Sequence, residues 1–215
     1  MSGPSDKSFE VPVHIRNIIF DLGGVFINLD NALTEKSFRA LGAKDFSNYF
    51  GHGFASSFFI DYELGKISNV QFIAELRSML GKYVPDEELI KAWNALLLDF
   101  LKERIDILDQ LKNKYRLFLF SNTNALHLAE VRKIYAKGFP NRSLEDHFER
   151  AYYSHILGLR KPDRSSFEYI ILENHLDPAS TLFVDDALIN VQGAFAAGLQ
   201  GYFLDKGQTV TNIRW

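Results

Sequence analysis

The sequence contains no cysteine, which excludes disulfide bonds, thiolate nucleophiles and zinc sites built on cysteine. Its 24 Lys and Arg and 27 Asp and Glu are scattered without a basic block, so we expect no nucleic-acid partner. No run of about 18 apolar residues occurs, and the first ten residues are polar, so we expect neither a membrane span nor a signal peptide. A cytoplasmic location is the expectation, although a secreted protein can equally lack cysteine.

What the chain has in quantity is apolar surface to bury. Of its 215 residues, 47% are apolar and 14% aromatic, which is enough for a full hydrophobic core. This composition is typical of a globular protein with one domain and a sizeable insertion, or with two modest domains. We expect a monomer or a weak homodimer.

The stretch from residue 15 to residue 25 organises the rest of the chain. An apolar run, Ile15 to Phe20, ends in Asp21, and Gly23 and Gly24 follow. The run is continuous rather than alternating, so it predicts a strand with both faces covered. The glycines predict a tight turn that leaves Asp21 at the strand's end, and residues 25–30 alternate weakly enough to form a small hairpin or flap.

Residues 31–111 show helical periodicity and no convincing buried strand. Ser68 and Gln71 form a capping box at the start of one predicted helix, and Pro85 opens another. The stripe of the second predicted helix comprises Leu89, Trp93, Leu96 and Phe100. The aromatic stretch from Phe46 to Phe59 is expected in the core of this insertion, with a possible place in the wall of a substrate pocket. We therefore predict a helical cap over residues 31–111 and a core formed by residues 1–30 and 112–215.

Strands alternate with helices after the insertion. We predict strands near residues 117–120, 151–154, 181–184 and 201–204, with helices near 125–136, 165–174 and 190–197. Asp177 is expected to cap a short helical turn that begins at Pro178. This order is typical of an α/β fold with an open, mostly parallel sheet.

Polar side chains follow the predicted strands where each one ends. Asp21 follows the first strand, Ser121 and Asn122 the second, and Asp185 and Asp186 the fourth, while Lys161 lies in the loop after the third. Open α/β sheets bind ligands outside the carboxyl ends of their strands. Carboxylates can hold Mg²⁺, Lys161 and Ser121 can bind phosphoryl oxygens, and a second carboxylate can attack phosphorus. The set predicts phosphoryl transfer.

These residues resemble, in order, the four short motifs of the haloacid dehalogenase-like hydrolase superfamily, in the subfamily with a helical cap after the first strand. The likeness runs from about Asn17 to Leu204. It implies a Rossmann-like sheet of about five strands in the order 5-4-1-2-3. Residues 62–68 also look like those of small-cap members that dephosphorylate sugar phosphates such as glucose 1-phosphate. The resemblance therefore implies a Mg²⁺-dependent phosphatase of a small phosphorylated metabolite.

The resemblance assigns a role to each motif residue. It implies that Asp21 is the nucleophile, and that Ser121, Asn122 and Lys161 bind the phosphoryl group. Asp21, the carbonyl of Gly23 and Asp186 are the implied direct ligands of Mg²⁺, and Asp185 and Asn190 act through its waters.

One position departs from the pattern. Most phosphatases of the superfamily place a general acid two residues after the nucleophile, and here that residue is Gly23. General acid catalysis contributes a factor of about 10² to 10⁴ in rate. We therefore expect substrates with good leaving groups, such as anomeric, acyl or aryl phosphates, or a proton donor supplied by the cap or the substrate.

Other interpretations stay open. Taken alone, each motif is an ordinary turn, helix cap or loop lysine, and only the ordered set points to a site. A metal-independent 2-haloacid dehalogenase uses the same aspartate, and a phosphate-binding or regulatory protein could have kept the site without turnover. Asn124 and His127 lie close enough to the second strand to reach the crevice, but we favour packing at the helix start.

Overall fold

The computed structural model describes residues 9–43, 50–51, 54–55 and 57–215. Its centre is a five-stranded parallel sheet in the order β7-β6-β1-β8-β9. In chain order its strands are β1 (Asn17–Phe20), β6 (Arg116–Ser121), β7 (Arg150–Tyr153), β8 (Thr181–Asp185) and β9 (Gln200–Phe203). This is the predicted order of the five strands, so the α/β fold class is confirmed, with strand ends that differ from the prediction by one or two residues.

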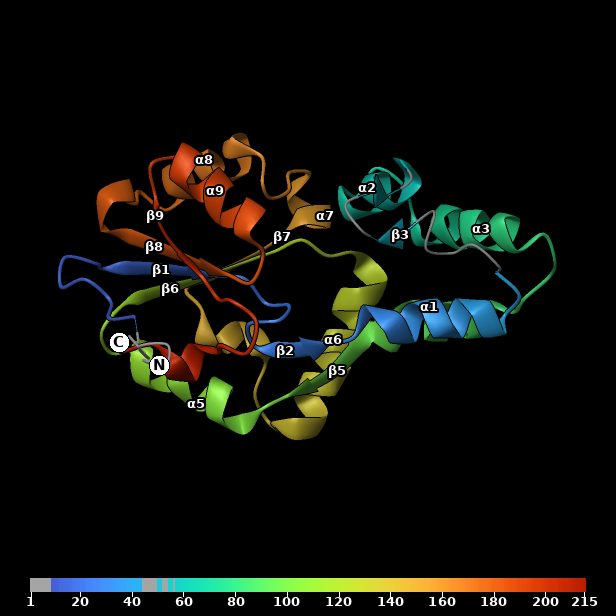
Figure 1. The fold of residues 1–215 in the computed structure, drawn as a ribbon, viewed down its shortest axis with the longest axis horizontal. Helices are drawn as coiled ribbons and strands as arrows, with labels where there is room; N and C mark the ends of the chain where they lie inside the picture. The colour runs from blue at the N-terminus through green and yellow to red at the C-terminus, as the bar shows by residue number, and fades with distance from the viewer. Residues whose placement is uncertain (1–8, 44–49, 52–53, 56) are drawn as a thin grey trace, which may run out of the picture.

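Helices cover both faces of the sheet (Figure 1). On one face lie α8 (Arg164–Glu173) and α9 (Leu188–Ala196), and on the other lie α5 (Lys102–Leu111) and α6 (Ala125–Gly138). A short helix, α7 (Ser154–Leu157), follows β7. The layers are therefore those of a doubly wound α/β fold.

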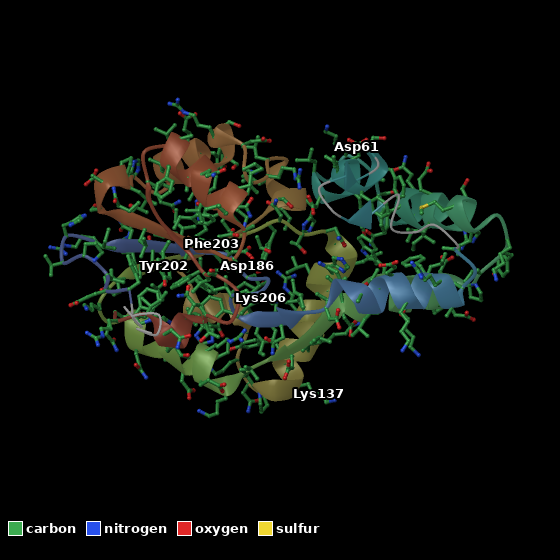
Figure 2. All side chains as sticks on the ribbon, viewed as in Figure 1. Asp61, Lys137, Asp186, Tyr202, Phe203 and Lys206 are labelled. Atoms are coloured by element: carbon green, nitrogen blue, oxygen red, sulfur yellow. The ribbon has the colours of Figure 1, made fainter. Side chains whose placement is uncertain are left out.

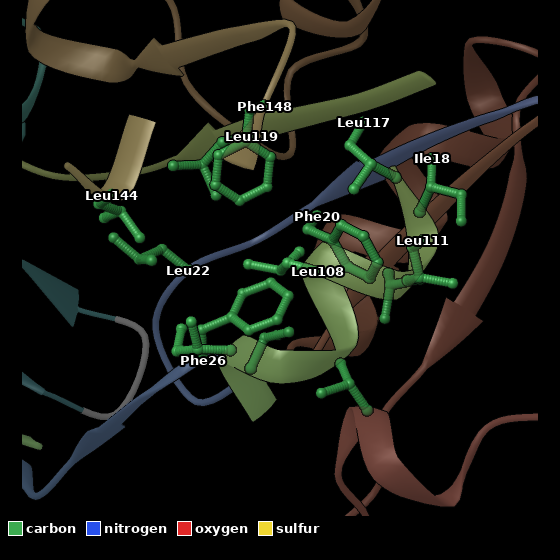
Figure 3. Packing of buried hydrophobic residues seen from close by; sticks show 14 of the residues in the cluster. Ile18, Phe20, Leu22, Phe26, Leu108, Leu111, Leu117, Leu119, Leu144 and Phe148 are labelled. Atoms are coloured by element: carbon green, nitrogen blue, oxygen red, sulfur yellow. The ribbon is translucent and has the colours of Figure 1, made fainter. Parts of the chain in front are cut away.

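The continuous apolar strands divide their side chains between two cores. Ile18 and Phe20 of β1 pack with Leu108 of α5, as Figure 3 shows, whereas Ile19 joins Phe167 of α8 on the opposite face. Successive side chains of a strand point to opposite faces, so a strand covered on both sides must be apolar at every position. This confirms the expectation drawn from the uninterrupted run before Asp21.

Residues 31–93 contain a second group of helices, which lies beside the sheet in Figure 1. We call α1 (Asn31–Ala40), α2 (Ser57–Glu63), α3 (Asn69–Leu80) and α4 (Asp86–Trp93) the cap helices. They share a separate hydrophobic cluster centred on Phe72, Phe59 and Trp93. The predicted capping box is present, because the Ser68 hydroxyl accepts from the Gln71 amide and the Gln71 side chain accepts from the Ser68 amide. Part of the Phe46–Phe59 stretch lies outside the described residues.

The insertion also contains short strands that the helical periodicity did not indicate, and the one whose burial is described, at residues 97–100, is not buried. Residues 97–100 form β5, which pairs antiparallel with β2 (Ile27–Leu29), and two-residue strands β3 (Phe50–Gly51) and β4 (Phe54–Ala55) also pair. The predicted stripe from Leu89 to Phe100 therefore spans a helix that ends at Trp93 and a strand. Buried Thr34 explains why the helix ends at Trp93. Its hydroxyl donates to the Trp93 carbonyl and accepts from the Leu96 amide, so these two groups bond to a side chain in place of the main-chain partners that they would have in a continuing α-helix.

The β2–β5 ribbon carries both passages of the chain between the sheet and the cap helices. Residues 25–30, predicted as a small hairpin or flap, thus pair with a segment about seventy residues away. Beyond β5, Ile105, Leu108 and Leu111 of α5 lie in the cluster under the sheet. The division into core and cap stays a proposal, and this packing favours a second boundary near residue 101 instead of 111. Within the described residues, no helix combines the length and apolarity needed to cross a bilayer.

We predict that Phe72→Ala lowers the free energy of unfolding by about 3–5 kcal/mol. Phe72 is fully buried and stacks on Tyr62 with ring centroids 3.9 Å apart, so its removal leaves a cavity in the cap cluster. Val70→Ala is the control on the same helix, because Val70 is 78% exposed, and we expect it to change stability by no more than about 0.5 kcal/mol. Urea unfolding measures both, and equal effects would contradict the packing.

Candidate active site

The carboxyl ends of three neighbouring strands bring the predicted site residues together. The Asp21 amide donates to the Val184 carbonyl at 2.9 Å, which continues the β1–β8 ladder by one residue. Ser121 is the last residue of β6 and Asp185 the last of β8, and Figure 2 shows Asp186 at the edge of the sheet that faces the cap helices. Parallel strands end at one edge, so residues far apart in sequence meet there.

Lys161 lies at the centre of this group. Its Nζ is 2.6 Å from Asp21 Oδ1 and 2.7 Å from Asp185 Oδ2, and its side chain is 1% exposed. The ammonium also lies 5.5 Å from the ring centroid of Phe120 and 5.4 Å from that of Phe183. Burial alone would lower the pKa of Lys161, but Asp185 and Asp21 outweigh it and raise the pKa, so the amine stays charged.

Asp185 has both carboxylate oxygens engaged. Oδ1 accepts from the Ala187 amide at 2.7 Å, Oδ2 accepts from Lys161, and the Asn190 amide group donates to both oxygens at 3.1 and 3.0 Å. Asp185 is fully buried. Its position suits a residue that orients its neighbours better than one that reaches a ligand directly.

Three carboxylates lie close enough to share one cation. One oxygen from each of Asp21, Asp185 and Asp186 lies within 4.8 Å of the others. Burial and the Asp185 carboxylate raise the pKa of Asp186, to about 6, and burial raises the pKa of Asp21 against the opposing effect of Lys161. With all three carboxylates ionised, they and the Lys161 ammonium leave an excess of two negative charges, which one divalent cation would neutralise. An all-oxygen set of this kind fits Mg²⁺.

Position 24 requires glycine, because the Asp186 carboxylate lies against it. The φ of Gly24 is +70°, in the left-handed region, and a Cβ on it would overlap the Oδ2 atom of Asp186. The turn is compact, because the Phe26 and Ile27 amides both donate to the Leu22 carbonyl. Sequence reasoning assigned Gly24 only to the turn, since the carboxylate that touches it lies more than 160 residues away.

Gly23 is the position where the resemblance expected an acid. A Cβ there would lie 2.8 Å from Cδ1 of Leu29 and 3.9 Å from Oδ2 of Asp21. Leu29 belongs to β2 and is held by the pairing with Leu97. The space beside Asp21 at this position is therefore filled by an apolar side chain.

The loop after β6 is held by two reciprocal pairs of hydrogen bonds. Asn122 exchanges hydrogen bonds with the main chain of Lys161, and the Ser154 hydroxyl accepts from the Thr123 amide and donates to the Thr123 carbonyl. Within the described part of the chain, the Ser121 hydroxyl has no hydrogen-bond partner. In this the Ser121 hydroxyl differs from the Asn122 side chain, whose two polar atoms both contact Lys161.

Asn124 and His127 pack at the start of α6, as favoured from the sequence. Asn124 caps the helix by accepting from the His127 amide, and the His127 ring stacks on Trp93 of α4 with centroids 4.7 Å apart. Burial lowers the pKa of His127 to about 3, so its ring is neutral. Sequence reasoning missed that this stacking connects the start of α6 to the cap helices. A second connection is the Tyr62 hydroxyl, which accepts from the Leu126 amide at 3.2 Å.

The structure therefore groups Asp21, Lys161, Asp185, Asp186 and Asn190 around one point. Asn122 is joined to Lys161, and Ser121 ends the neighbouring strand β6. Gly23 lies in the turn that follows Asp21. The individual roles of these residues stay predictions.

Comparison with known proteins gives a consistent picture. The family model described as haloacid dehalogenase-like hydrolase matches residues 15–198. A D-ribitol-5-phosphate phosphatase of Bacteroides thetaiotaomicron is 29% identical over 195 residues, which cover 90% of this chain and 93% of that protein.

Two solved structures are similar over most of their length. A HAD family enzyme of Bacteroides thetaiotaomicron, a point variant in complex with magnesium and inorganic phosphate, has a TM-score of 0.86 and 32% identity, covering 90% of this chain and 96% of that one. A HAD-like family hydrolase of Porphyromonas gingivalis has a TM-score of 0.82 and 34% identity, covering 91% and 94%.

We predict that Gly24→Ala weakens Mg²⁺ binding by about tenfold to a hundredfold. The new methyl group must push the Asp186 carboxylate away from the other two. Gly81→Ala is the matched control, because Gly81 also has a positive φ, +61°, but has open space around its Cβ position. Calorimetric titration with Mg²⁺ measures both variants, and equal Mg²⁺ affinities in the two variants would contradict the role of the contact between Gly24 and Asp186.

Proposed function

The chain belongs to the haloacid dehalogenase-like hydrolase family, and from that premise we propose that it is a Mg²⁺-dependent phosphatase of a small phosphorylated metabolite. The observation that carries the proposal is the buried Lys161 ammonium shared by Asp21 and Asp185, with Asp186 beside them. A cation at a carboxylate edge is suited to the charge of a transferring phosphoryl group. The solved relative with magnesium and inorganic phosphate supports the same chemistry.

In the proposed mechanism, Asp21 is the nucleophile. One of its oxygens forms a bond to phosphorus while the bond from phosphorus to the ester oxygen breaks, and the departing alkoxide takes a proton from water or from the substrate. Water then hydrolyses the aspartyl phosphate to inorganic phosphate and restores Asp21. Lys161 holds Asp21 in place and stabilises negative charge on the transferring group, and the Ser121 hydroxyl donates to a phosphoryl oxygen.

The proposed ligands of Mg²⁺ are Asp21, the Gly23 carbonyl and Asp186, with Asp185 and Asn190 acting through its waters. The engagement of both Asp185 oxygens by Lys161, Asn190 and the Ala187 amide supports this division. When bound, the cation would neutralise charge on the phosphoryl oxygens and fix their orientation.

For the substrate we propose a phosphorylated sugar or sugar alcohol. The D-ribitol-5-phosphate phosphatase among the relatives supports this class. Gly23, with Leu29 over it, offers no proton to a leaving alcohol, which favours an ester with a good leaving group. A 5-phosphate of ribitol is an ester of a primary alcohol, so the relative and the missing acid favour different members of the class.

We predict hydrolysis of p-nitrophenyl phosphate that requires Mg²⁺ and is abolished by a chelator. The same assay on glucose 1-phosphate, glucose 6-phosphate and D-ribitol 5-phosphate tests the leaving-group proposal. A higher kcat/KM for glucose 1-phosphate than for the other two supports it, and a preference for either primary ester overturns it. Halide release from a 2-haloacid without added metal would instead establish the dehalogenase alternative, and no turnover on any phosphate ester would favour a binding protein.

We predict that Asp21→Asn lowers kcat by about a thousandfold or more with little change in thermal stability, because an amide cannot form the acyl phosphate. Asp30→Asn is the matched control, since it makes the same chemical change on the same segment at an exposed helix cap that Asn also satisfies. Steady-state kinetics and melting curves measure both. Appreciable residual turnover in Asp21→Asn would contradict covalent catalysis by this residue.

A further inference from the structure

The Asn122 side chain forms two hydrogen bonds with the main chain of a single residue, Lys161. Its Nδ2 donates to the Lys161 carbonyl at 2.9 Å, and its Oδ1 accepts from the Lys161 amide at 2.9 Å. The amide group of Asn122 has one donor and one acceptor directed at the same residue, which is the pattern of a paired strand residue. Asn122 therefore joins the loop after β6 to the loop that carries Lys161.

Lys161 has no other main-chain support of this kind. Within the residues that the structure describes, its amide and carbonyl make no hydrogen bond except those to Asn122, and Pro162 after it has no amide hydrogen to donate. The two bonds hold the start of the Lys161 side chain, which then passes Phe120 and Phe183 to reach Asp21 and Asp185. A shift of the Lys161 main chain would move the ammonium away from both carboxylates.

We propose that Asn122 is a positioning residue for Lys161, and that its side chain sets the place of the ammonium instead of binding the phosphoryl group. This inference rests on the proposed function, because it assigns Asn122 a role through Lys161. The resemblance implied phosphoryl contact through the Ser121 hydroxyl and the main chain, and the inference adds to this a separate role for the Asn122 side chain, whose two polar atoms are directed at Lys161.

The neighbouring pair of Ser154 and Thr123 provides a matched control. Ser154 is fully buried and exchanges hydrogen bonds of 2.9 and 2.9 Å with the Thr123 main chain. Ser154→Ala and Asn122→Ala each remove two hydrogen bonds from the same loop, but only Asn122→Ala frees Lys161. A role that is merely structural would make the two variants alike.

The experiment is a double-mutant cycle between Asn122→Ala and Lys161→Met, read by the affinity for inorganic phosphate in the presence of Mg²⁺. In the wild-type background, we expect Asn122→Ala to weaken phosphate binding by about tenfold or more, the size typical for loss of a buried hydrogen-bond partner. In the Lys161→Met background, we expect a further effect smaller than about twofold, because a residue that acts through Lys161 has nothing left to position. Ser154→Ala is expected to weaken phosphate by the same factor in both backgrounds.

Hydrogen exchange of the Lys161 amide, followed by NMR at a temperature where every variant is folded, tests the contact itself. Asn122→Ala should speed this exchange and Ser154→Ala should leave it slow. Equal losses of phosphate affinity in both Lys161 backgrounds, or a Lys161 amide that stays protected in Asn122→Ala, would overturn the inference. An absence of Mg²⁺-dependent hydrolysis by the wild-type protein would instead overturn the proposed function, and the exchange measurement does not depend on it.

Discussion

The ion pair network of Lys161 is the constraint on which the site depends. Transfer of an ammonium and a carboxylate from water into a protein interior costs several kcal/mol per ion, and hydrogen bonds between the ions recover this only when the geometry is good. Here one amine reaches two carboxylates at 2.6 and 2.7 Å and is 1% exposed. Such a pair adds little to stability compared with apolar side chains of the same size. Its presence at the ligand-binding edge of a parallel sheet is therefore better explained by chemistry than by folding.

The fold meets this constraint by assembling parts that are distant in sequence. Lys161 and Asp21 are 140 residues apart, and they meet only when β1 pairs with β8 and β6. The two cores on either side of the sheet fix those strands, and the Phe120 and Phe183 rings beside the ammonium belong to one of them. The network also has an unbalanced charge, since one ammonium faces two carboxylates and Asp186 adds a third. A divalent cation resolves this imbalance, so the metal site and the buried lysine are two parts of one electrostatic arrangement.

Much of this arrangement could be predicted from the sequence, for identifiable reasons. Continuous apolar runs identified buried strands, and the polar residues after them identified the edge where the site lies, so the convergence of Asp21, Lys161 and Asp185 followed. The sheet order came from the family resemblance. The end of α4 at Trp93 could not be predicted, because it depends on Thr34, which lies on another helix. The contact of Gly24 with Asp186 and the pairing of Asn122 with Lys161 were hidden for the same reason. Local patterns report the strand on which a residue lies, whereas these contacts depend on partners that only the folded chain brings near.

The region beside Asp21 limits where a proton for the leaving alcohol can come from. Gly23 has no side chain, and Leu29 of the β2–β5 ribbon fills the space that a side chain at that position would occupy. The main chain of Leu29 is held in place, because the ribbon is also the connection between the sheet and the cap helices. Those helices are tied to the start of α6 by Tyr62 and by the stacking of Trp93 on His127, whose ring is neutral and packed against α4. A proton donor must therefore come from the substrate, from water or from a cap residue other than Tyr62 and Trp93. An ester whose leaving group departs without a proton needs no such donor and therefore suits this site best.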